Sequence, residues 1–367
     1  MNQLKLIRAA TIPTSLSIFC SGMLRELSHD YEVIALSSCG KELDTIAKRE
    51  GVKTIGVNME RRFAPFKDIF SLIKLIQVFK KERPDIIHSI TPKAGLLCMM
   101  AAWFTRVPIR IHTFTGLVFP TSSGLKRYIL MLTDKITCAC ATHIIPEGEG
   151  VKNDLINFHI TSKPLRVLGY GNIRGVDLNY FTPEHEFHEN FRFLYIGRIV
   201  NDKGIKELVQ AFIRLPEEAQ LWLVGDIEAS DPVDDNIMQV IHQHPRITLF
   251  NSTNDVRSFY NNVDCVVLPS YREGFPNVVI EAGAMQLPAI VTDINGSREI
   301  VINSENGLIV PSKNVDKLYQ AMYFLLNNPQ IADNMGKAAR PIIEQKFEQS
   351  FVRQCLYNYY KEITHAV

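Results

Sequence analysis

The stretch from Leu268 to Arg298 reads LPSYREGFPNVVIEAGAMQLPAIVTDINGSR and decides the fold. An apolar run ends at Leu268, and a glycine-aromatic-proline turn, an apolar helix, a short buried strand and a second glycine turn follow it. Two carboxylates, Glu273 and Glu281, are separated by seven residues. This order of elements predicts one mononucleotide-binding unit.

The rest of the second half repeats this alternation of strands and helices. We predict strands at 192–196, 220–224, 247–250, 265–268 and 288–292. Helices are predicted at 206–215, 236–242, 256–261 and 278–285, and the segment 315–364 is also expected to be helical. Strands that alternate with helices indicate a parallel sheet with crossover helices.

The first half shows the same pattern. We predict strands at 4–10, 31–37, 53–57, 85–88, 109–112 and 142–146. The segment 165–180 is rich in glycine and turn residues, and its GxG does not open a helix, so it indicates a linker. The fold class is therefore α/β, with two doubly wound domains facing an interdomain cleft, which is a preferred ligand site. A length of 367 residues fits two domains.

Composition is that of an ordinary soluble globular protein, with 46% hydrophobic and 22% charged residues. Residues 1–180 hold 24 Lys+Arg against 15 Asp+Glu, whereas residues 181–367 hold 16 against 24. The basic first half predicts an anionic partner, either a membrane surface or a phosphorylated substrate, unless the two surfaces differ by chance. Nucleic acid is disfavoured because the cations are dispersed and no binding module is present.

Seven scattered cysteines indicate reduced thiols of a cytosolic protein. Cys138 and Cys140 form only a CxC, which is a weak metal signal, so we expect no metal. The N-terminus fits neither a secretory signal nor a spanning helix. Any membrane contact is therefore expected to be peripheral, on the inner face of the cytoplasmic membrane.

A basic amphipathic helix is predicted from about Asp68 to Glu82. Its apolar stripe consists of Ile69, Leu72, Ile73, Ile76 and Phe79. Such a helix can lie on anionic lipid, but we expect the stripe to cover the sheet. The preceding loop, which includes Arg61 and Arg62, is cationic and aromatic, and either contacts a membrane or acceptor or is an ordinary loop.

Loops that follow the strands of the first half are candidate ligand sites, because open α/β sheets bind ligands at their carboxyl edge. Lys93 stands where such a loop enters a helix, so it either binds an anion or is a solvated lysine. His112 ends a buried strand and is either a ligand or base, or a structural histidine.

In the second half, Gly197-Arg198 follows a strand and Lys203 precedes the start of a helix. Arg198 and Lys203 thus place two cations, together with free backbone amides, at the carboxyl edge of the predicted second sheet. Such a site can bind a diphosphate and neutralise its charge without a metal ion. The alternatives are an ion-paired Arg198 and a solvated Lys203.

Glu273 lies in the turn after a strand, and Glu281 lies about one turn into the following helix. The amides between Gly274 and Asn277 point toward a helix N-terminus that binds an anion or hydroxyls. Carboxylates accept hydrogen bonds from vicinal sugar hydroxyls, so one glutamate can hold a hexose and the other a ribose. Alternatively, neither glutamate binds a ligand: Glu281 is a first-turn residue that the helix dipole favours, and Glu273 is a charged residue of a surface loop.

Several of these motifs together resemble a known family. EGFPNVVIEA at 273–282, together with Gly197-Arg198, Lys203-Gly204 and NGSRE at 295–299, closely resembles the retaining glycosyltransferases of GT-B fold that carry the Glu, seven residues, Glu motif. In the first half, TPKAGL at 91–96 and TFTG at 113–116 resemble the bacterial branch that makes capsule, O-antigen or other exopolysaccharide.

The resemblance implies a Rossmann-like, acceptor-side domain at 1–170, a donor domain at 171–345 and a helix at 346–367 that packs back on the first domain. It implies that Arg198 and Lys203, with Gly197, hold the donor diphosphate and stabilise the leaving nucleotide. Glu273 is then expected to contact the donor sugar, with help from Gly274 and the amides of Phe275 and Asn277, and Glu281 to hold the ribose.

Retention in this family is thought to proceed by front-face attack with the departing phosphate as base, so no protein nucleophile and no cofactor are expected. The absence of a DxD triplet in the sequence agrees with a metal-independent mechanism.

Two positions depart from the family. Many relatives have histidine where this chain has Thr115, before Gly116, so either His112 substitutes for it from a shifted position or the donor needs no such contact. The donor expected from this difference is a 6-deoxy or an N-acetylated amino sugar. The turn at Thr11 lacks the paired glycines of many relatives, which leaves its phosphate contact open.

The predicted function is transfer of a sugar from a nucleoside diphosphate, UDP in our interpretation, to a lipid-linked glycan. The basic first half, with Thr11, Lys93, Arg61 and Arg62, then faces the acceptor pyrophosphate and an anionic membrane. The alternatives are a UDP-sugar epimerase on the same fold and a non-catalytic sugar-nucleotide-binding subunit.

Overall fold

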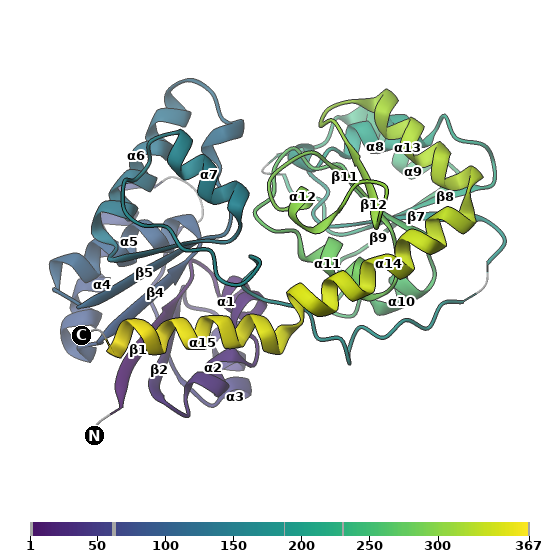
Figure 1. The fold of residues 1–367 in the computed structure, drawn as a ribbon. Coiled ribbons are helices and arrows are strands. Elements are labelled where there is room, and N and C mark those ends of the chain that lie inside the picture. Colours follow the sequence, from purple (N-terminus) through teal and green to yellow (C-terminus); the bar gives the residue numbers. More distant parts are fainter. Residues whose placement is uncertain (1–2, 61–63, 187, 230, 366–367) are drawn as a thin grey trace. The chain divides into compact units, whose positions relative to one another are not determined.

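The computed structural model describes residues 3–60, 64–186, 188–229 and 231–365. The chain folds into two compact units, Figure 1. The first unit contains Met1–Arg174 and Arg353–Val367, and the second contains Gly175–Val352. Each is an α/β unit built on one parallel sheet, as the alternation of strands and helices predicts.

The first sheet has the order β3-β2-β1-β4-β5-β6. Its strands are β1 (Leu4–Ala9), β2 (Tyr31–Ser37), β3 (Lys53–Gly56), β4 (Ile86–Ile90), β5 (Ile109–Phe114) and β6 (His143–Pro146). Neighbouring strands pair in parallel, with Leu6 opposite Val33 on one side and Ile86 on the other. The order reverses beside β1, which is the point where doubly wound sheets bind ligands.

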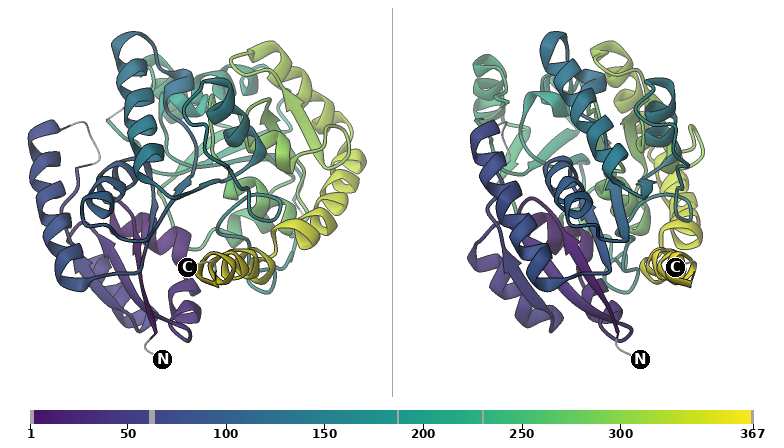
Figure 2. Two further views of the ribbon diagram at one scale, coloured as in Figure 1. Left: turned by 60° about the vertical axis from the view of Figure 1, so that its left-hand side comes forward. Right: turned by 90° about the vertical axis from the view of Figure 1, so that its left-hand side faces the viewer.

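Helices cover both faces of this sheet. They are α1 (Pro13–Cys20), α2 (Met23–Leu27), α3 (Lys41–Glu50), α4 (Pro65–Glu82), α5 (Pro92–Phe104), α6 (Gly124–Cys140), α7 (Glu149–Asn157) and α15 (Gln349–His365), with the 3-10 turn η1 at Phe119–Thr121. Successive strand residues point to opposite faces, so Ile7 packs under α4, α5 and α6 whereas Leu6 packs under α1 and α15. The helices α4, α5 and α6 lie side by side, as Figure 2 shows.

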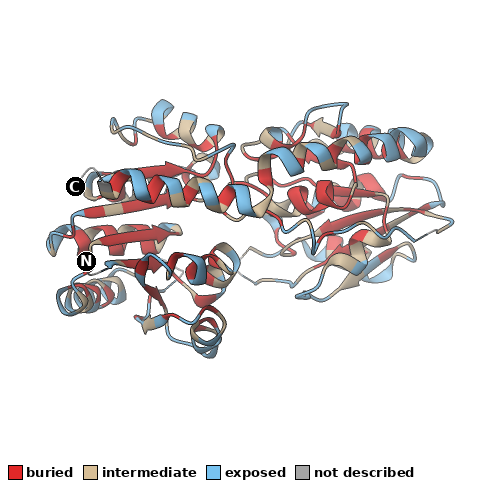
Figure 3. Ribbon diagram, turned by 60° about the horizontal axis from the view of Figure 1, so that its bottom comes forward, coloured by how far each residue is buried: buried red, intermediate tan, exposed pale blue. Residues whose placement is uncertain are grey.

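The second sheet has the order β12-β11-β10-β7-β8-β9. Its strands are β7 (Phe191–Ile196), β8 (Ala219–Val224), β9 (Ile247–Phe250), β10 (Cys265–Leu268), β11 (Ala289–Thr292) and β12 (Gly307–Val310). All strands that pair do so in parallel, and β10 is buried along its whole length. In Figure 3 the strands of both sheets are largely buried beneath helices with exposed outer faces.

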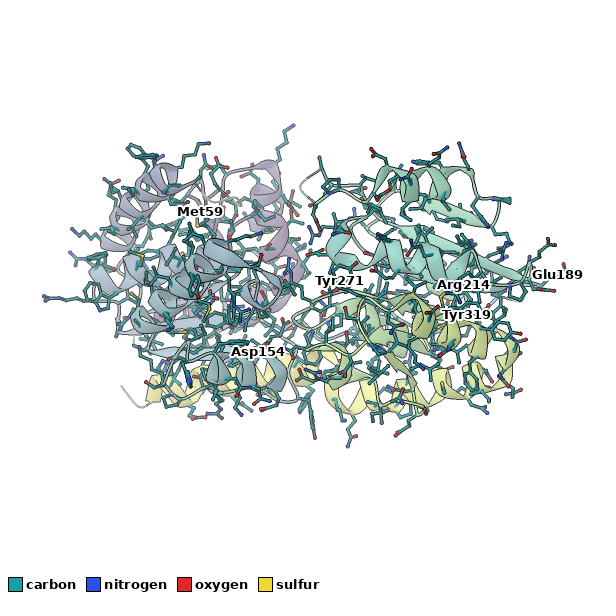
Figure 4. The ribbon with its side chains drawn as sticks, turned by 90° about the horizontal axis from the view of Figure 1, so that it is seen from above. Met59, Asp154, Glu189, Arg214, Tyr271 and Tyr319 are labelled. Carbon is teal, nitrogen blue, oxygen red and sulfur yellow. The ribbon has the colours of Figure 1, made fainter. Side chains whose placement is uncertain are left out.

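The helices of the second unit follow the strands in turn. They are α8 (Ile205–Phe212), α9 (Asp235–Gln243), α10 (Arg257–Asn261), α11 (Asn277–Ala284), α12 (Ser297–Ile300), α13 (Val315–Asn327) and α14 (Pro329–Phe347), with η2 at Asn201–Lys203. Between α8 and α13, the Arg214 guanidinium lies 4.3 Å from the centre of the Tyr319 ring, and both are labelled in Figure 4. This contact is a cation–π interaction.

Two local differences from the sequence prediction have simple causes. The sequence from about Leu16 to Leu27 predicts one amphipathic helix, but the structure has α1 and α2 there, divided at Gly22, whose φ of 72° is left-handed. The strand β12, with the sequence GLIV, was not predicted; it begins with a glycine, a residue that is depleted in strands.

The expected apolar stripe of α4 is wrong in part. Ile69 and Ile73 are exposed, whereas Ser71, Leu75 and Phe79 are buried against the sheet. This helix carries apolar residues on nearly every side, so periodicity alone does not decide which side faces the core. A second apolar face therefore points away from the first unit.

The C-terminal part of α15 is held to the first unit by a buried polar cluster. Arg8 of β1 donates to the hydroxyl of Tyr360 at 2.8 Å and also contacts Nδ1 of His88. The Tyr360 hydroxyl lies 2.6 Å from His88 Nδ1, and Nε2 of His88 lies 2.7 Å from the hydroxyl of Thr113. These contacts fit a neutral imidazole that accepts at Nδ1 and donates at Nε2. Burial, followed by the charge of Arg8, holds the pKa of His88 well below its ordinary value.

Candidate functional site

The loop after β7 begins with Gly197, which closely approaches the loop after β8. A Cβ atom on Gly225 would lie 1.9 Å from the carbonyl oxygen of Gly197, so the chain needs a glycine there. The buried Tyr195 donates from its hydroxyl to the carbonyl of Arg198 at 2.8 Å. Arg198 in turn forms a 3.0 Å ion pair with Glu228. These contacts fix the Arg198 backbone at the carboxyl edge of the second sheet.

Lys203 ends the short turn η2 and meets the loop that follows β10. Its Nζ donates to Oε1 of Glu273 at 2.5 Å, and both side chains are mostly buried. Gly204, with φ of 71°, passes so close to Pro269 that an added Cβ would lie 2.2 Å from the proline carbonyl oxygen. The structure thus brings together Lys203 and Glu273, which are 70 residues apart in the sequence.

A second ion pair lies directly beside the first. Asp202 pairs with Arg272 at 2.7 Å, and the carbonyl of Asp202 accepts from the backbone amide of Tyr271 at 2.9 Å. The hydroxyl of Tyr271, which is labelled in Figure 4, donates to the carboxylate of Glu207 at 2.7 Å. Sequence reasoning missed these positioning contacts, although the polar residues beside Lys203 and Glu273 were a visible signal. The two adjacent pairs have opposite polarity and tie the two loops together.

Glu281 lies on α11 and is buried. Its Oε2 accepts from the hydroxyl of Tyr260 at 3.0 Å, and Tyr260 is itself fully buried on α10. The side chain of Phe275 is also buried, with its ring centre 5.3 Å from that of Phe347. The first helical residue is Asn277, so the turn at 274–276 leads directly into the helix N-terminus. The two glutamates therefore differ in surroundings, one ion-paired and the other hydrogen-bonded to a phenol.

The second glycine turn of the 268–298 stretch, at Gly296, packs against the turn at 274–276. A Cβ atom on Gly296 would lie 2.2 Å from the carbonyl oxygen of Gly274, and φ at Gly296 is 76°. Nearby in sequence, Ser270 and Ser297 have buried Oγ atoms without a hydrogen-bond partner in the described part of the chain. The site thus combines charged, amide and hydroxyl groups, which suit a ligand with phosphates and sugar hydroxyls.

In the first unit, the candidate residues lie at the switch between β1 and β4. The Thr11 hydroxyl lies 2.8 Å from that of Thr91 and accepts from the Ala94 amide at 3.2 Å. Lys93 pairs with Asp68 of α4 at 2.5 Å and is mostly buried, so it is not a solvated loop lysine. Arg61 and Arg62 lie outside the described residues.

His112 is packed inside the first unit. Its Nδ1 lies 2.9 Å from the Ser89 hydroxyl, and a Cβ added to Gly95 would lie 2.3 Å from its Cε1. Burial lowers the pKa of His112 to about 3. These surroundings favour the structural interpretation that the sequence left open. Thr115 lies beyond the end of β5, before Gly116, whose φ of 110° permits the turn there.

Two features are absent from the part of the chain that the structure describes. No group of three or more His, Cys, Asp or Glu side chains there has an arrangement that could hold a metal ion. No described helix has both the length and the apolar character needed to cross a bilayer.

Two family models match the chain, one on each half. Residues 179–341 match "Glycosyl transferases group 1", and residues 20–172 match "Glycosyltransferase Family 4". The first match includes Arg198, Lys203, Glu273 and Glu281.

Curated relatives include polysaccharide enzymes. The chain is 34% identical to the capsular polysaccharide biosynthesis glycosyltransferase CapM of Staphylococcus aureus, over 98% of this chain and 97% of CapM. It is 28% identical to the UDP-Gal:alpha-D-GlcNAc-diphosphoundecaprenol alpha-1,3-galactosyltransferase of Escherichia coli, over 78% of each chain. It is 26% identical to the N,N'-diacetylbacillosaminyl-diphospho-undecaprenol alpha-1,3-N-acetylgalactosaminyltransferase of Campylobacter jejuni, over 79% of this chain and 80% of that protein.

Among solved structures, the chain is similar to HepE of Anabaena in complex with UDP. The TM-score is 0.80 at 15% identity, with 98% of this chain and 100% of HepE covered. A sucrose-phosphate synthase from Thermosynechococcus elongatus gives a TM-score of 0.81 at 19% identity, over 99% of this chain and 100% of the synthase. Because the sequence identities to these two structures are only 15% and 19%, the similarity establishes the fold alone.

Proposed function

The chain belongs to the group 1 glycosyltransferase family, and we propose that it is a retaining, metal-independent enzyme that transfers a sugar from a UDP-sugar to a lipid-linked glycan. Its GT-B fold and glycosyltransferase activity follow from the family. Capsular or other surface polysaccharide biosynthesis is the process to which the curated relatives point. The nucleotide, the stereochemistry and the acceptor are the finer parts of the proposal.

The single observation that carries the proposal is the contact between Lys203 and Glu273 at the carboxyl edge of the second sheet, 2.5 Å from nitrogen to oxygen. In the proposal, Lys203 and Arg198 hold the donor diphosphate, and Glu273 holds hydroxyls of the donor sugar. Because Arg and Lys keep their charge at neutral pH, they can stabilise the charge that develops on the departing UDP without a metal.

Glu281 takes the ribose in this proposal. Its hydrogen bond from Tyr260 fixes the carboxylate, so its second oxygen is held in a defined direction. Gly197, Gly274 and the amides of Phe275 and Asn277 contribute backbone groups near the phosphates and the sugar. Thr115 replaces a donor-contacting histidine, and Thr11 and Lys93 belong to the acceptor side.

The reaction needs no protein nucleophile in this account. The acceptor hydroxyl attacks the anomeric carbon on the face from which UDP departs, the glycosidic bond to UDP breaks, and the acceptor proton passes to the departing phosphate. Glu273 then positions the sugar, and its carboxylate need not gain or lose a proton.

The acceptor is proposed to be linked to a lipid diphosphate. Two relatives have diphosphoundecaprenol glycans in their names, and the first half of this chain has the more basic sequence. A lipid acceptor places the enzyme peripherally on the inner face of the cytoplasmic membrane.

Replacement of Lys203 by alanine tests the proposed donor site. Lys203→Ala is expected to lower kcat/KM for UDP release about 100-fold or more, because a charge at the leaving group acts mainly in the transition state. The matched control is Lys206→Ala, which removes an exposed lysine three residues away on α8. Equal activity of both variants would place the diphosphate elsewhere.

The donor sugar is proposed to be 6-deoxy or an N-acetylated amino sugar, since Thr115 stands where many relatives have histidine. Initial rates with a panel of UDP-sugars measure this preference. A clear preference for a plain hexose with a 6-hydroxyl would contradict it.

A further inference from the structure

The most exposed large hydrophobic side chains in the described part of the chain gather on two helices of the first unit. Six of them, with exposed fractions from 56% to 81%, belong to α4 and α6: Phe66, Ile69, Phe70, Leu125, Tyr128 and Leu132. Phe104 and Trp103, which end the intervening helix α5, follow at 54% and 53%, and Ile227 of the second unit is as exposed as Trp103. Scattered exposed hydrophobics are ordinary, but a concentration on neighbouring helices indicates an interaction surface.

These residues form regular stripes. On α4, Phe66, Ile69, Phe70 and Ile73 follow the spacing i, i+3, i+4 and i+7 of a single helix face. On α6, Leu125, Tyr128 and Leu132 follow i, i+3 and i+7. We call these seven side chains the α4/α6 apolar surface.

The two stripes lie at the same end of their helices. Both helices cross over between parallel strands, so they run in the same direction, and both stripes occupy the N-terminal halves. Figure 2, right, looks onto α4, α5 and α6 lying side by side. The stripes therefore flank α5 on one outer face of the first unit.

The charge of these helices is strongly positive. Together α4, α5 and α6 contain eight Lys+Arg and three Asp+Glu. Lys74 on α4 and Lys126 on α6 adjoin the apolar stripes in sequence and are exposed. Two other cations, Lys67 and Lys93, have carboxylate partners in Glu60 and Asp68.

We propose that the α4/α6 apolar surface docks on an anionic lipid bilayer. Aromatic and aliphatic side chains enter the boundary between headgroups and acyl chains, while the neighbouring lysines contact anionic headgroups. The proposal deepens the proposed function by naming the face that meets the membrane, and it rests on that function only for the lipid-linked acceptor.

Charge favours a bilayer over a second copy of the chain. A symmetric dimer through this surface brings the same excess of positive charge from both copies face to face. An anionic bilayer supplies the opposite charge and an apolar interior at once. The arrangement of the stripes therefore fits a lipid surface better than self-association.

Vesicle co-sedimentation of the full chain tests the proposal without a donor or acceptor. The vesicles contain phosphatidylglycerol and phosphatidylcholine, or phosphatidylcholine alone. We expect the double variant Phe66→Ser with Leu125→Ser to bind anionic vesicles about tenfold more weakly or worse, because both side chains are mostly exposed and leave the core unchanged. The matched control, Ile227→Ser with Tyr323→Ser, removes exposed hydrophobics of the second unit and should bind as the parent does.

A second double variant tests the electrostatic contribution of the lysines to vesicle binding. Lys74→Ala with Lys126→Ala should weaken binding to anionic vesicles and reduce its dependence on salt, because fewer cations then meet the headgroups. Thermal unfolding of all variants checks that folding is unchanged. Equal vesicle binding by the Phe66 and Leu125 variant, or binding independent of phosphatidylglycerol, overturns the proposal.

Two further measurements separate the possible failures. Sedimentation velocity that shows a dimer disrupted by Phe66→Ser with Leu125→Ser assigns the surface to a second copy and overturns the bilayer proposal. Transfer to a water-soluble acceptor analogue should be unchanged in this variant. If the parent chain transfers sugar but does not bind anionic vesicles, only the docking proposal fails. If the parent chain binds the vesicles but transfers no sugar, only the proposed function fails.

Discussion

At the residue scale, the site depends on close backbone approaches as well as on charges. Arg198, Lys203 and Glu273 were predicted from their positions after strands, because the carboxyl ends of parallel strands meet at one edge. Their partners were not predictable in the same way. Glu228, Asp202 and Arg272 come from loops whose distances depend on the folded backbone.

The close approach of Gly296 to Gly274 gives a residue-scale prediction. Gly296→Ala should reduce donor turnover about tenfold or more and lower stability by about 1–3 kcal/mol, because a Cβ would meet the Gly274 carbonyl and shift the turn before α11. Steady-state kinetics and thermal unfolding measure both effects.

Gly51→Ala is the matched control for this prediction. Gly51 has a φ of 71°, close to that of Gly296, but no atom lies within 4 Å of an added Cβ. Gly51→Ala therefore introduces a similar backbone strain, but its added Cβ meets no other atom. Equal losses of turnover in both variants would mean that the turn at Gly274 does not depend on this contact.

Buried histidines lead to a prediction for stability against pH. The pKa of His112 is lowered to about 3 by burial, so the folded state holds it neutral while the unfolded state binds a proton below about pH 6.5. Stability is therefore fully present above pH 6.5 and falls as the pH decreases toward 3. The expected contribution to the slope is up to about 1.4 kcal/mol per pH unit.

Denaturant unfolding at pH 7 and pH 5 measures this slope. His112→Asn should show a shallower loss than the parent, whereas His29→Asn, at an exposed position, should keep the parental slope. If the parent and both variants lose the same free energy of unfolding between pH 7 and pH 5, His112 is not the cause of the pH dependence. This pH interval avoids most carboxylate titration.

At the element scale, α15 is held to the first unit by the hydroxyl of Tyr360. Tyr360→Phe should lower the stability of that unit by about 1–3 kcal/mol, because Arg8 and His88 lose a buried hydrogen-bond partner. Calorimetry measures the change. Tyr357 lies on the same helix, and its hydroxyl makes a solvent-exposed contact with Asp30. Tyr357→Phe should therefore lower the stability less than Tyr360→Phe does. An equal loss of stability in the two variants would contradict a special role for the buried cluster.

The helix α4 shows where sequence reasoning about elements reaches its limit. Its existence follows from composition and from the strands on either side, but the choice of buried face does not, because Phe66, Ile69 and Phe70 are as apolar as Leu75 and Phe79. In the folded unit, Leu75 and Phe79 belong to the core cluster shared with the sheet and with α5. His112 is similar, since its burial comes from the approach of Gly95 on α5.

At the scale of the whole molecule, the two sheets and their strand orders follow the predicted alternation. Each unit has six parallel strands with the order reversed beside its first strand. The second unit carries Arg198, Lys203, Glu273 and Glu281, and the first unit carries the α4/α6 apolar surface. Donor chemistry and membrane contact are therefore assigned to different units.

Product analysis tests the central claim most directly. The full chain is incubated with a UDP-sugar, with and without a lipid extract that contains acceptor, and both nucleotide and lipid fractions are identified. We predict that UDP forms only with the extract and that the sugar appears in the lipid fraction with its anomeric configuration retained. Conversion of the donor into a different UDP-sugar without acceptor would contradict it and identify an epimerase.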